Sequence, residues 1–244
     1  YRVLIDKLYN FLENNNKFMN TDLQNRIDRL LVKVDQAAKK ANRSPDEIKI
    51  LAISKGQDSS QIKNLFELGQ IRFGENYLQE ALIKQEQLRN LNIEWHFVGS
   101  IQSNKTKEIA RSFSYIHSVD RIKIAERLNA HREGQKMALN VLLQIRDDES
   151  NKNGITLDES YRFLRAFKEF NNLRLRGLMY FPDAGKTEQE SIYDYQKVAD
   201  LLTEIESGDT LSMGTSDDYS LAIQSGATMI RIGTELFGPR NEKR

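Results

Sequence analysis

Residues 48–68 read IKILAISKGQDSSQIKNLFEL, an apolar run followed by a short polar turn and a helix-like stretch. The run 48–54 is mostly β-branched and apolar, which predicts a buried strand. Gly56 and Asp58 mark the turn, and apolar residues return at helical spacing from Ser59 onward. This strand–turn–helix unit is the first of a series, and its repetition decides the predicted fold.

The same alternation continues along the rest of the chain, with a helix-like run in every gap between eight strand-like runs. The strands are short and mostly apolar, without strict alternation, which is typical of parallel strands covered on both faces. The strand-like runs are 48–54, 71–74, 93–99, 115–119, 140–146, 173–179, 210–213 and 229–233. The helix-like runs are 59–68, 76–88, 106–113, 121–132, 160–170, 188–206 and 217–224.

The predicted fold class is therefore α/β, a single (β/α)8 barrel of the TIM type with an extra N-terminal helix. A doubly wound open sheet is the alternative, but the glycine fingerprint GxGxxG of nucleotide-binding sheets is missing after the first strand. No shift in composition marks a second domain. We expect residues 21–244 to form one barrel domain.

Residues 1–20 stand apart from the alternating pattern. They hold a few apolar residues at helical spacing and then a polar run, and we interpret them as an N-terminal extension of uncertain order. A helix is predicted from Asn20 or Thr21 to about Ala41, with Thr21 or Asp22 as its cap. Its apolar stripe consists of Leu23, Ile27, Leu30, Leu31 and Val34.

Composition excludes several classes of function. The net charge of +1 gives no electrostatic reason to expect nucleic-acid binding. The chain has no cysteine, which excludes disulfides, thiolate nucleophiles and cysteine-based zinc sites. No apolar run approaches the roughly 18 residues that span a bilayer, and the first residues are too polar for a secretory signal. A soluble cytoplasmic protein without a membrane partner is expected.

Lys55 is the first candidate site residue, because it follows the first predicted strand directly. Active sites of such barrels form at the carboxyl ends of the strands. Desolvation lowers the pKa of an ammonium group, and the neutral amine can condense with an aldehyde to form a Schiff base. The alternative is a strand-end lysine whose ammonium group simply reaches water.

The ends of the seventh and eighth predicted strands indicate a phosphate site. Ser212 supplies a hydroxyl group, and Gly214 and Gly233 allow the backbone to approach a ligand closely. Thr234 follows Gly233 at a predicted turn, and backbone N–H groups at such helix starts bind phosphate. Ordinary capping by the Thr215-Ser216-Asp217 segment is the alternative.

Arg231 is the second unusual charge, because it lies in an otherwise apolar strand. Counting in steps of two puts its side chain on the same face of the strand as Gly233. A guanidinium group there stays charged and would donate hydrogen bonds to a ligand. The alternative is a buried arginine paired with a carboxylate, such as Glu75 or Asp120.

The histidines are less informative. His96 either contacts a ligand or is a hydrogen-bonded core residue, and His117 and His131 share no spacing with it. Three scattered histidines do not indicate a metal site, and we predict no metal and no catalytic acid pair. The stretch Lys84-Gln85-Glu86 is interpreted as an exposed helix face.

Taken in order, these segments resemble the pyridoxal phosphate homeostasis protein family, which is related to the N-terminal barrel of alanine racemase, a fold type III pyridoxal phosphate enzyme. The resemblance covers about residues 21–240. Each stretch alone is weak, but together they are highly specific. They are Ala52-Ile53-Ser54-Lys55, Phe73-Gly74-Glu75-Asn76-Tyr77-Leu78-Gln79-Glu80, Trp95-His96-Phe97-Val98-Gly99-Ser100-Ile101-Gln102-Ser103-Asn104-Lys105, Leu211-Ser212-Met213-Gly214-Thr215-Ser216-Asp217-Asp218 and Arg231-Ile232-Gly233-Thr234-Glu235-Leu236-Phe237-Gly238.

The resemblance implies that residues 21–244 bind pyridoxal 5'-phosphate. Lys55 would carry the cofactor as an aldimine, and Arg231 would lie at the pyridine nitrogen. Asn76 would lie near the cofactor. The phosphate would be held by Ser212, Gly233 and Thr234.

The resemblance also implies a cofactor carrier in vitamin B6 homeostasis, without substantial amino-acid turnover. An arginine cannot accept a proton, so the pyridine nitrogen stays unprotonated and the cofactor is a poor electron sink. In the racemases a second, β-rich domain supplies another base, and this chain ends soon after the eighth strand. The expected partners are the cofactor and apo pyridoxal phosphate enzymes, and the expected state is a monomer. The alternatives are an alanine racemase-like enzyme and a Schiff-base aldolase.

Two segments depart from the family's pattern. Gly56-Gln57-Asp58 stands where the family commonly has Thr-Lys-Pro, so the usual second lysine is Gln57. This puts in doubt any part played by a lysine there in cofactor release. The loop after the fifth strand, 146–152, also differs, and Lys152 is only loosely matched to a family lysine.

Overall fold

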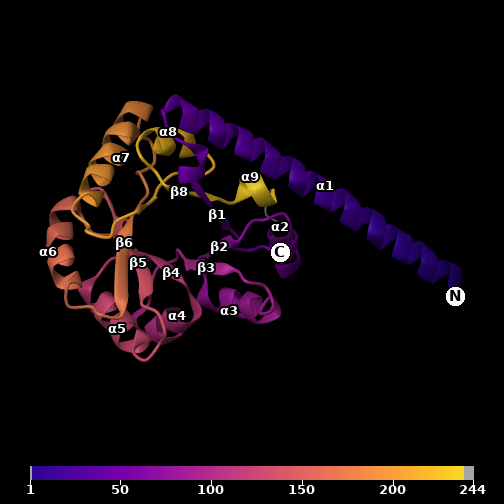
Figure 1. Cartoon of the computed structure of the whole chain (residues 1–244), viewed down its shortest axis with the longest axis horizontal. Coiled ribbons are helices and arrows are strands. Elements are labelled where there is room, and N and C mark those ends of the chain that lie inside the picture. Colours follow the sequence, from indigo (N-terminus) through magenta and orange to yellow (C-terminus); the bar gives the residue numbers. More distant parts are fainter. Residues whose placement is uncertain (1, 239–244) are drawn as a thin grey trace.

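The computed structural model describes the backbone of residues 2–238 and the side chains of residues 21–238. Eight parallel strands pair in chain order, and the last returns to pair with the first, so the sheet closes into a barrel (Figure 1). The predicted α/β barrel is confirmed, and the open sheet is excluded. The strands are β1 (Lys49–Ile53), β2 (Arg72–Glu75), β3 (Glu94–Phe97), β4 (Tyr115–Val119), β5 (Leu139–Ile145), β6 (Leu173–Tyr180), β7 (Thr210–Ser212) and β8 (Met229–Ile232).

Helices follow the strands and form the outer layer of the barrel, and every helix predicted between two strands is present with ends shifted by a few residues. The helix predicted at 160–170 begins earlier, at Leu157, because Thr156 and Glu159 form a capping box at its start. The helices are α2 (Ser59–Glu67), α3 (Leu78–Gln87), α4 (Thr106–Ser112), α5 (Ile122–Arg132), α6 (Leu157–Phe167), α7 (Glu188–Leu202), α8 (Tyr219–Gln224) and α9 (Thr234–Phe237), with short 3-10 helices η1 (Pro45–Glu47) and η2 (Ser103–Lys105).

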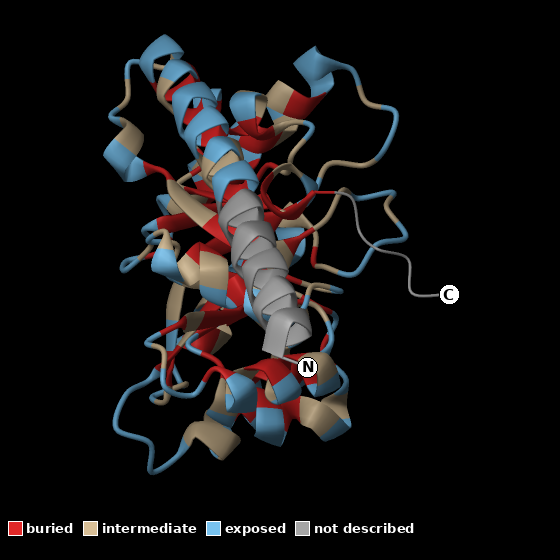
Figure 2. Cartoon of the chain, turned by 90° about the vertical axis from the view of Figure 1, so that its right-hand side faces the viewer, coloured by how far each residue is buried: buried red, intermediate tan, exposed pale blue. Residues whose placement is uncertain are grey.

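The N-terminal helix α1 (Arg2–Lys40) is continuous, so the predicted start at Asn20 or Thr21 is wrong. Neither glycine nor proline interrupts this span, and asparagine lowers helix propensity only moderately. The helix packs against α8 and α9, and buried and exposed residues alternate along its described half (Figure 2). Leu31 of the predicted stripe is 50% exposed. The buried residues are Leu23, Leu30, Val34, Ala37 and Ala38. No helix in the described part of the chain combines the length and apolarity needed to cross a membrane.

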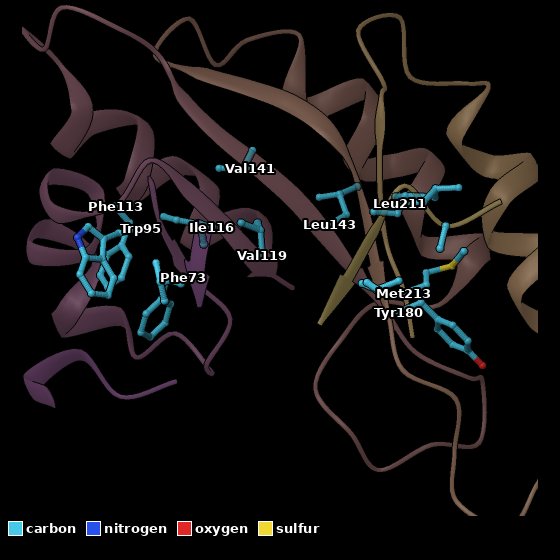
Figure 3. Close-up of a cluster of buried hydrophobic side chains, with 14 of the residues drawn as sticks. Phe73, Trp95, Phe113, Ile116, Val119, Val141, Leu143, Tyr180, Leu211 and Met213 are labelled. Atoms are coloured by element: carbon cyan, nitrogen blue, oxygen red, sulfur yellow. The ribbon is translucent and has the colours of Figure 1, made fainter. Parts of the chain in front are cut away.

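The strand register decides which loops meet at the carboxyl end of the barrel. β1 lies between β2 and β8, with Ile53 opposite Gly74 and Ala52 opposite Ile232. Because parallel strands all end at the same face, the residues after β1, β2 and β8 come together there. Buried apolar side chains of the strands pack together with those of the surrounding helices in one cluster, and Figure 3 shows part of this packing.

Candidate functional site

A cavity of about 350 Å³ opens at the carboxyl ends of β1, β2 and β8. It brings together five of the six predicted site residues, and Ser212 is the one that does not line it. The predicted residues at the cavity are Lys55, Asn76, Arg231, Gly233 and Thr234. The other lining residues are Ile53, Val98, Phe181, Thr215, Ser216 and Asp217.

Lys55 occupies a tight turn that leads out of β1. The amide of Gln57 donates to the carbonyl oxygen of Ser54 at 3.0 Å, which closes the turn around Lys55 and Gly56. Gly56 has a φ of 73°, a left-handed conformation that glycine adopts without strain. The turn places the partly buried Lys55 side chain at the wall of the cavity.

The exposed helix face predicted at Lys84-Gln85-Glu86 is wrong in part. The Lys84 side chain is buried, and its Nζ pairs with carboxylates of Glu75 and Glu80, whereas Glu86 is exposed as expected. Lys84 follows the buried Ala81 by one helical turn, which puts both on the inward face of α3. That spacing is the sequence signal for its burial, although the lysine itself suggests an exposed position.

Arg231 is held from the core side by neutral groups. Its Nη1 donates to the carbonyl oxygen of Ser212 and, at 2.9 Å, to the Ser212 hydroxyl, and its Nη2 donates to the Tyr180 carbonyl oxygen at 3.0 Å. The guanidinium carbon lies 3.8 Å from the ring centre of Phe181. Burial lowers the pKa of Arg231 to about 10, so the group stays charged at neutral pH.

The alternative pairing of Arg231 with Glu75 or Asp120 is wrong, because Glu75 pairs with Lys84 and Asp120 with Arg121. One nitrogen atom of Arg231 makes none of these hydrogen bonds. Its Nε is buried and has no hydrogen-bond partner among the described residues, and the same is true of the Asn76 Oδ1 atom. Buried polar atoms are nearly always paired in folded proteins, so two unpaired atoms at one cavity fit a binding site for a polar ligand.

Ser212 is buried beneath the cavity. Its hydroxyl group lies between the Arg231 guanidinium group and the Nδ1 atom of His117, which is 3.0 Å away. Ser212 does not line the cavity, and its expected phosphate contact stays a prediction. Ser216, four residues later in the loop after β7, lines the cavity in its place.

A chain of hydrogen bonds continues from Ser212 through the barrel interior. The Nε2 atom of His117 lies 2.8 Å from Nδ1 of His96, and Nε2 of His96 lies 2.8 Å from Oε1 of Glu94. Burial lowers the pKa of both histidines, which keeps them neutral. Each neutral ring then donates on the Glu94 side and accepts on the Arg231 side, an assignment that satisfies every group in the chain.

The two histidines therefore have the core role that was one of the alternatives for His96. Sequence reasoning missed the contact between His96 and His117, although they lie on the adjacent strands β3 and β4. No cluster of histidine and carboxylate residues suited to a metal occurs in the described part of the chain.

Comparison with known proteins gives these features a context. Residues 28–241 match the alanine racemase N-terminal domain family. A pyridoxal phosphate homeostasis protein from Pseudomonas aeruginosa is 43% identical over 225 residues, which cover 91% of this chain and 97% of the relative. The protein of the same name from Escherichia coli K12 is 41% identical and covers 90% and 97% of the two chains. This chain belongs to the pyridoxal phosphate homeostasis protein family.

A solved structure is also similar to the present one. PipY of Synechococcus elongatus PCC7942, solved with PLP bound, is 31% identical with a TM-score of 0.74. The similarity covers 84% of this chain and 100% of PipY.

The two departures from the homeostasis protein pattern lie in loops at the same end of the barrel. Gln57 contributes its backbone amide to the turn around Lys55, as described above. Lys152 donates to the carbonyl oxygen of Pro182 at 2.7 Å and pairs with Asp183 at 2.9 Å. Lys152 is therefore committed to the loop after β6 and does not line the cavity.

Proposed function

We propose that this protein binds pyridoxal 5'-phosphate in the cavity above β1 and β8, with Lys55 carrying it as an aldimine. The bound cofactor is stored and supplied in vitamin B6 homeostasis, without substantial amino-acid turnover. The observation that carries this proposal is the unpaired Nε of Arg231 in the wall of the cavity that Lys55 also lines. The family membership and the PLP-bound PipY structure support the identity of the ligand.

The Arg231 side of the cavity suits a ring nitrogen with a free lone pair. The Nε–H group is a donor, and the guanidinium group keeps its proton at neutral pH, so it would donate and leave the ring nitrogen unprotonated. An unprotonated pyridine nitrogen withdraws few electrons, which makes the cofactor a poor sink for carbanions. This supports a holding role over racemization or decarboxylation.

The opposite end of the ligand needs donors for a phosphate group. Gly233 and Thr234 stand at the start of α9, where first-turn N–H groups lack partners within the helix. Ser216 adds a hydroxyl group from the loop after β7. Asn76 offers its amide group from the β2 side, where either amide atom can face a polar ligand substituent.

Delivery to apo pyridoxal phosphate enzymes by a cytoplasmic monomer completes the proposal. Its support is the family name, which refers to homeostasis of the cofactor. Because the aldimine bond is reversible, a lysine that binds the cofactor without further chemistry can also release it.

The visible spectrum tests this function most directly. The purified protein mixed with pyridoxal 5'-phosphate is expected to show the absorption band of a lysine Schiff base, which borohydride reduction fixes to Lys55. The band should be lost in Lys55→Ala and kept in Lys63→Ala, an exposed lysine of α2. A wild-type protein that stays colourless with excess cofactor contradicts the proposal. Steady racemization of alanine that disappears in Lys55→Ala would favour the racemase-like alternative.

A further inference from the structure

The residues on both sides of Lys55 are tied to one buried lysine on a neighbouring helix. Lys84 on α3 donates from Nζ to the carbonyl oxygen of Ser54 at 2.6 Å. The same Nζ reaches Oε1 of Glu75 at 2.7 Å and Oε1 of Glu80 at 2.5 Å. These three acceptors match the three donors of an ammonium group.

The two carboxylates also hold the turn themselves. Oε1 of Glu80 accepts a hydrogen bond from the amide of Gly56 at 2.6 Å, immediately after Lys55. Oε1 of Glu75 accepts from the Ser54 hydroxyl at 2.6 Å, immediately before it. The backbone that carries Lys55 is thus fixed on both sides by side chains from β2 and α3.

The cluster contains more negative than positive charge. Glu75 and Glu80 face the single ammonium group of Lys84, and the Glu75 Oε2 atom is buried without a partner among the described residues. Burial raises the pKa of Glu75, because the charged carboxylate is removed from water there. This cluster does not line the cavity itself, whose charged lining residues are Lys55, Arg231 on β8 and Asp217 after β7.

We propose that Glu80 and Lys84 are positioning residues for Lys55, in a cluster that fixes its backbone and favours the protonated form of its Schiff base. This inference rests on the proposed cofactor aldimine. A nearby negative charge stabilises a cation, so the excess carboxylate raises the pKa of the Schiff-base nitrogen. Glu80 reaches solvent with 29% of its side chain, so it can be changed with less disturbance than Lys84.

Two variants of Glu80 separate its charge from its hydrogen bonds. Glu80→Gln keeps an oxygen for the Gly56 amide but removes the charge, whereas Glu80→Ala removes both. Glu86→Gln is the matched control, because Glu86 lies on the same helix and its side chain is 70% exposed. The readouts are hydrogen exchange of the turn at residues 54–57 in cofactor-free protein, and the pH titration of the Schiff-base band.

In Glu80→Ala we expect the Gly56 amide to exchange about tenfold faster, since it loses a hydrogen bond to a charged acceptor. Glu80→Gln should retain most of the protection. In both variants the Schiff-base band should titrate at a pH lower by about one unit than in the control. Equal protection in Glu80→Ala and the control, or unchanged titration in both variants, overturns the inference.

Failure of the cofactor proposal has a different signature. A wild-type protein without the Schiff-base band contradicts the proposed function, whatever the Glu80 variants do. The exchange experiment needs no cofactor, so it still decides whether Glu80 holds the turn. Faster exchange only in Glu80→Ala, combined with a colourless wild type, would keep the positioning role and reject the aldimine.

Discussion

Two buried cations, one behind the turn that carries Lys55 and one in the wall of the cavity, are stabilised in opposite ways. Lys84, 4% exposed, is paired with two carboxylates, and all three of its donors are used within the protein. Arg231, 2% exposed, contacts carbonyl oxygens, a hydroxyl group and an aromatic ring. The lysine has its counter-charges close by, whereas the arginine is stabilised by neutral groups.

This difference decides what each cation can do for a ligand. Lys84 has no donor to spare, so its effect on the site passes through the turn that carries Lys55. The Nε atom of Arg231 has no hydrogen-bond partner within residues 21–238, and no carboxylate among those residues pairs with Arg231. We therefore expect the charge of Arg231 to act on a ligand, whereas the charge of Lys84 acts within the protein.

The largest expected effect comes from replacing Lys84, the cation that pairs with the two carboxylates. Lys84→Met leaves the carboxylates of Glu75 and Glu80 without their cation, and we expect it to lower the free energy of unfolding by about 3–5 kcal/mol. Urea denaturation measures this change. Lys63→Met removes an exposed lysine from α2 and should change it by no more than about 0.5 kcal/mol. Similar values for the two variants would show that the cluster contributes little to stability.

The buried histidines linked to Arg231 should make the stability of the protein sensitive to acid. The pKa values of His96 and His117 are lowered by burial, so the unfolded chain binds protons more readily than the folded one below about pH 6.5. The contribution of the two neutral histidines to the free energy of unfolding is fully present above that pH and is lost as the pH falls below it. Glu75, with a raised pKa, has the opposite sign, because its folded form favours the proton.

A variant isolates the histidine contribution. As the pH falls from about 7.5 to about 5.5, protonation of the two histidines should lower the free energy of unfolding by about 1–2 kcal/mol. His117→Gln should show a smaller acid-dependent loss than the wild type in urea denaturation at the two pH values. An identical loss in both proteins would contradict burial of a neutral His117.

The smallest effect concerns the serine that links Arg231 to the histidines. Ser212→Ala should lower the free energy of unfolding by about 1 kcal/mol, since it removes a hydrogen bond on each side of the hydroxyl. Ser225→Ala is the control, because its buried hydroxyl has no partner among the described residues and its loss should be nearly neutral.

The same variants locate the phosphate contact. Inorganic phosphate, measured by competition with pyridoxal 5'-phosphate, should bind Ser212→Ala as it binds the wild type. It should bind Ser216→Ala about tenfold more weakly, the effect of one lost hydrogen bond to a charged group. The reverse order would return the phosphate contact to Ser212, as the sequence first indicated.

The fold could be predicted because each strand–helix unit has its own local pattern, and eight repeats leave few arrangements. Lys55 and Arg231 could be located because charges in apolar strands are conspicuous. Ser212 and Ser216 could not be separated, since the pattern did not show that β7 ends at Ser212 and that the cavity wall starts in the loop beyond. The Lys84 cluster and the histidine chain depend on contacts between elements, which spacing along one element does not encode.

The position of α1 links the beginning of the described chain to its end. Lys33 pairs with Glu235 at 2.6 Å across 202 residues, and Arg43 donates to carbonyl oxygens of Ile223 and Ala227. Lys55 likewise follows the first strand, and Arg231 belongs to the last. During synthesis on the ribosome, the wall that carries Arg231 is thus the last part of the cavity to emerge. A nascent chain has the lysine long before it has the site, and ligand capture can begin only after the barrel has closed.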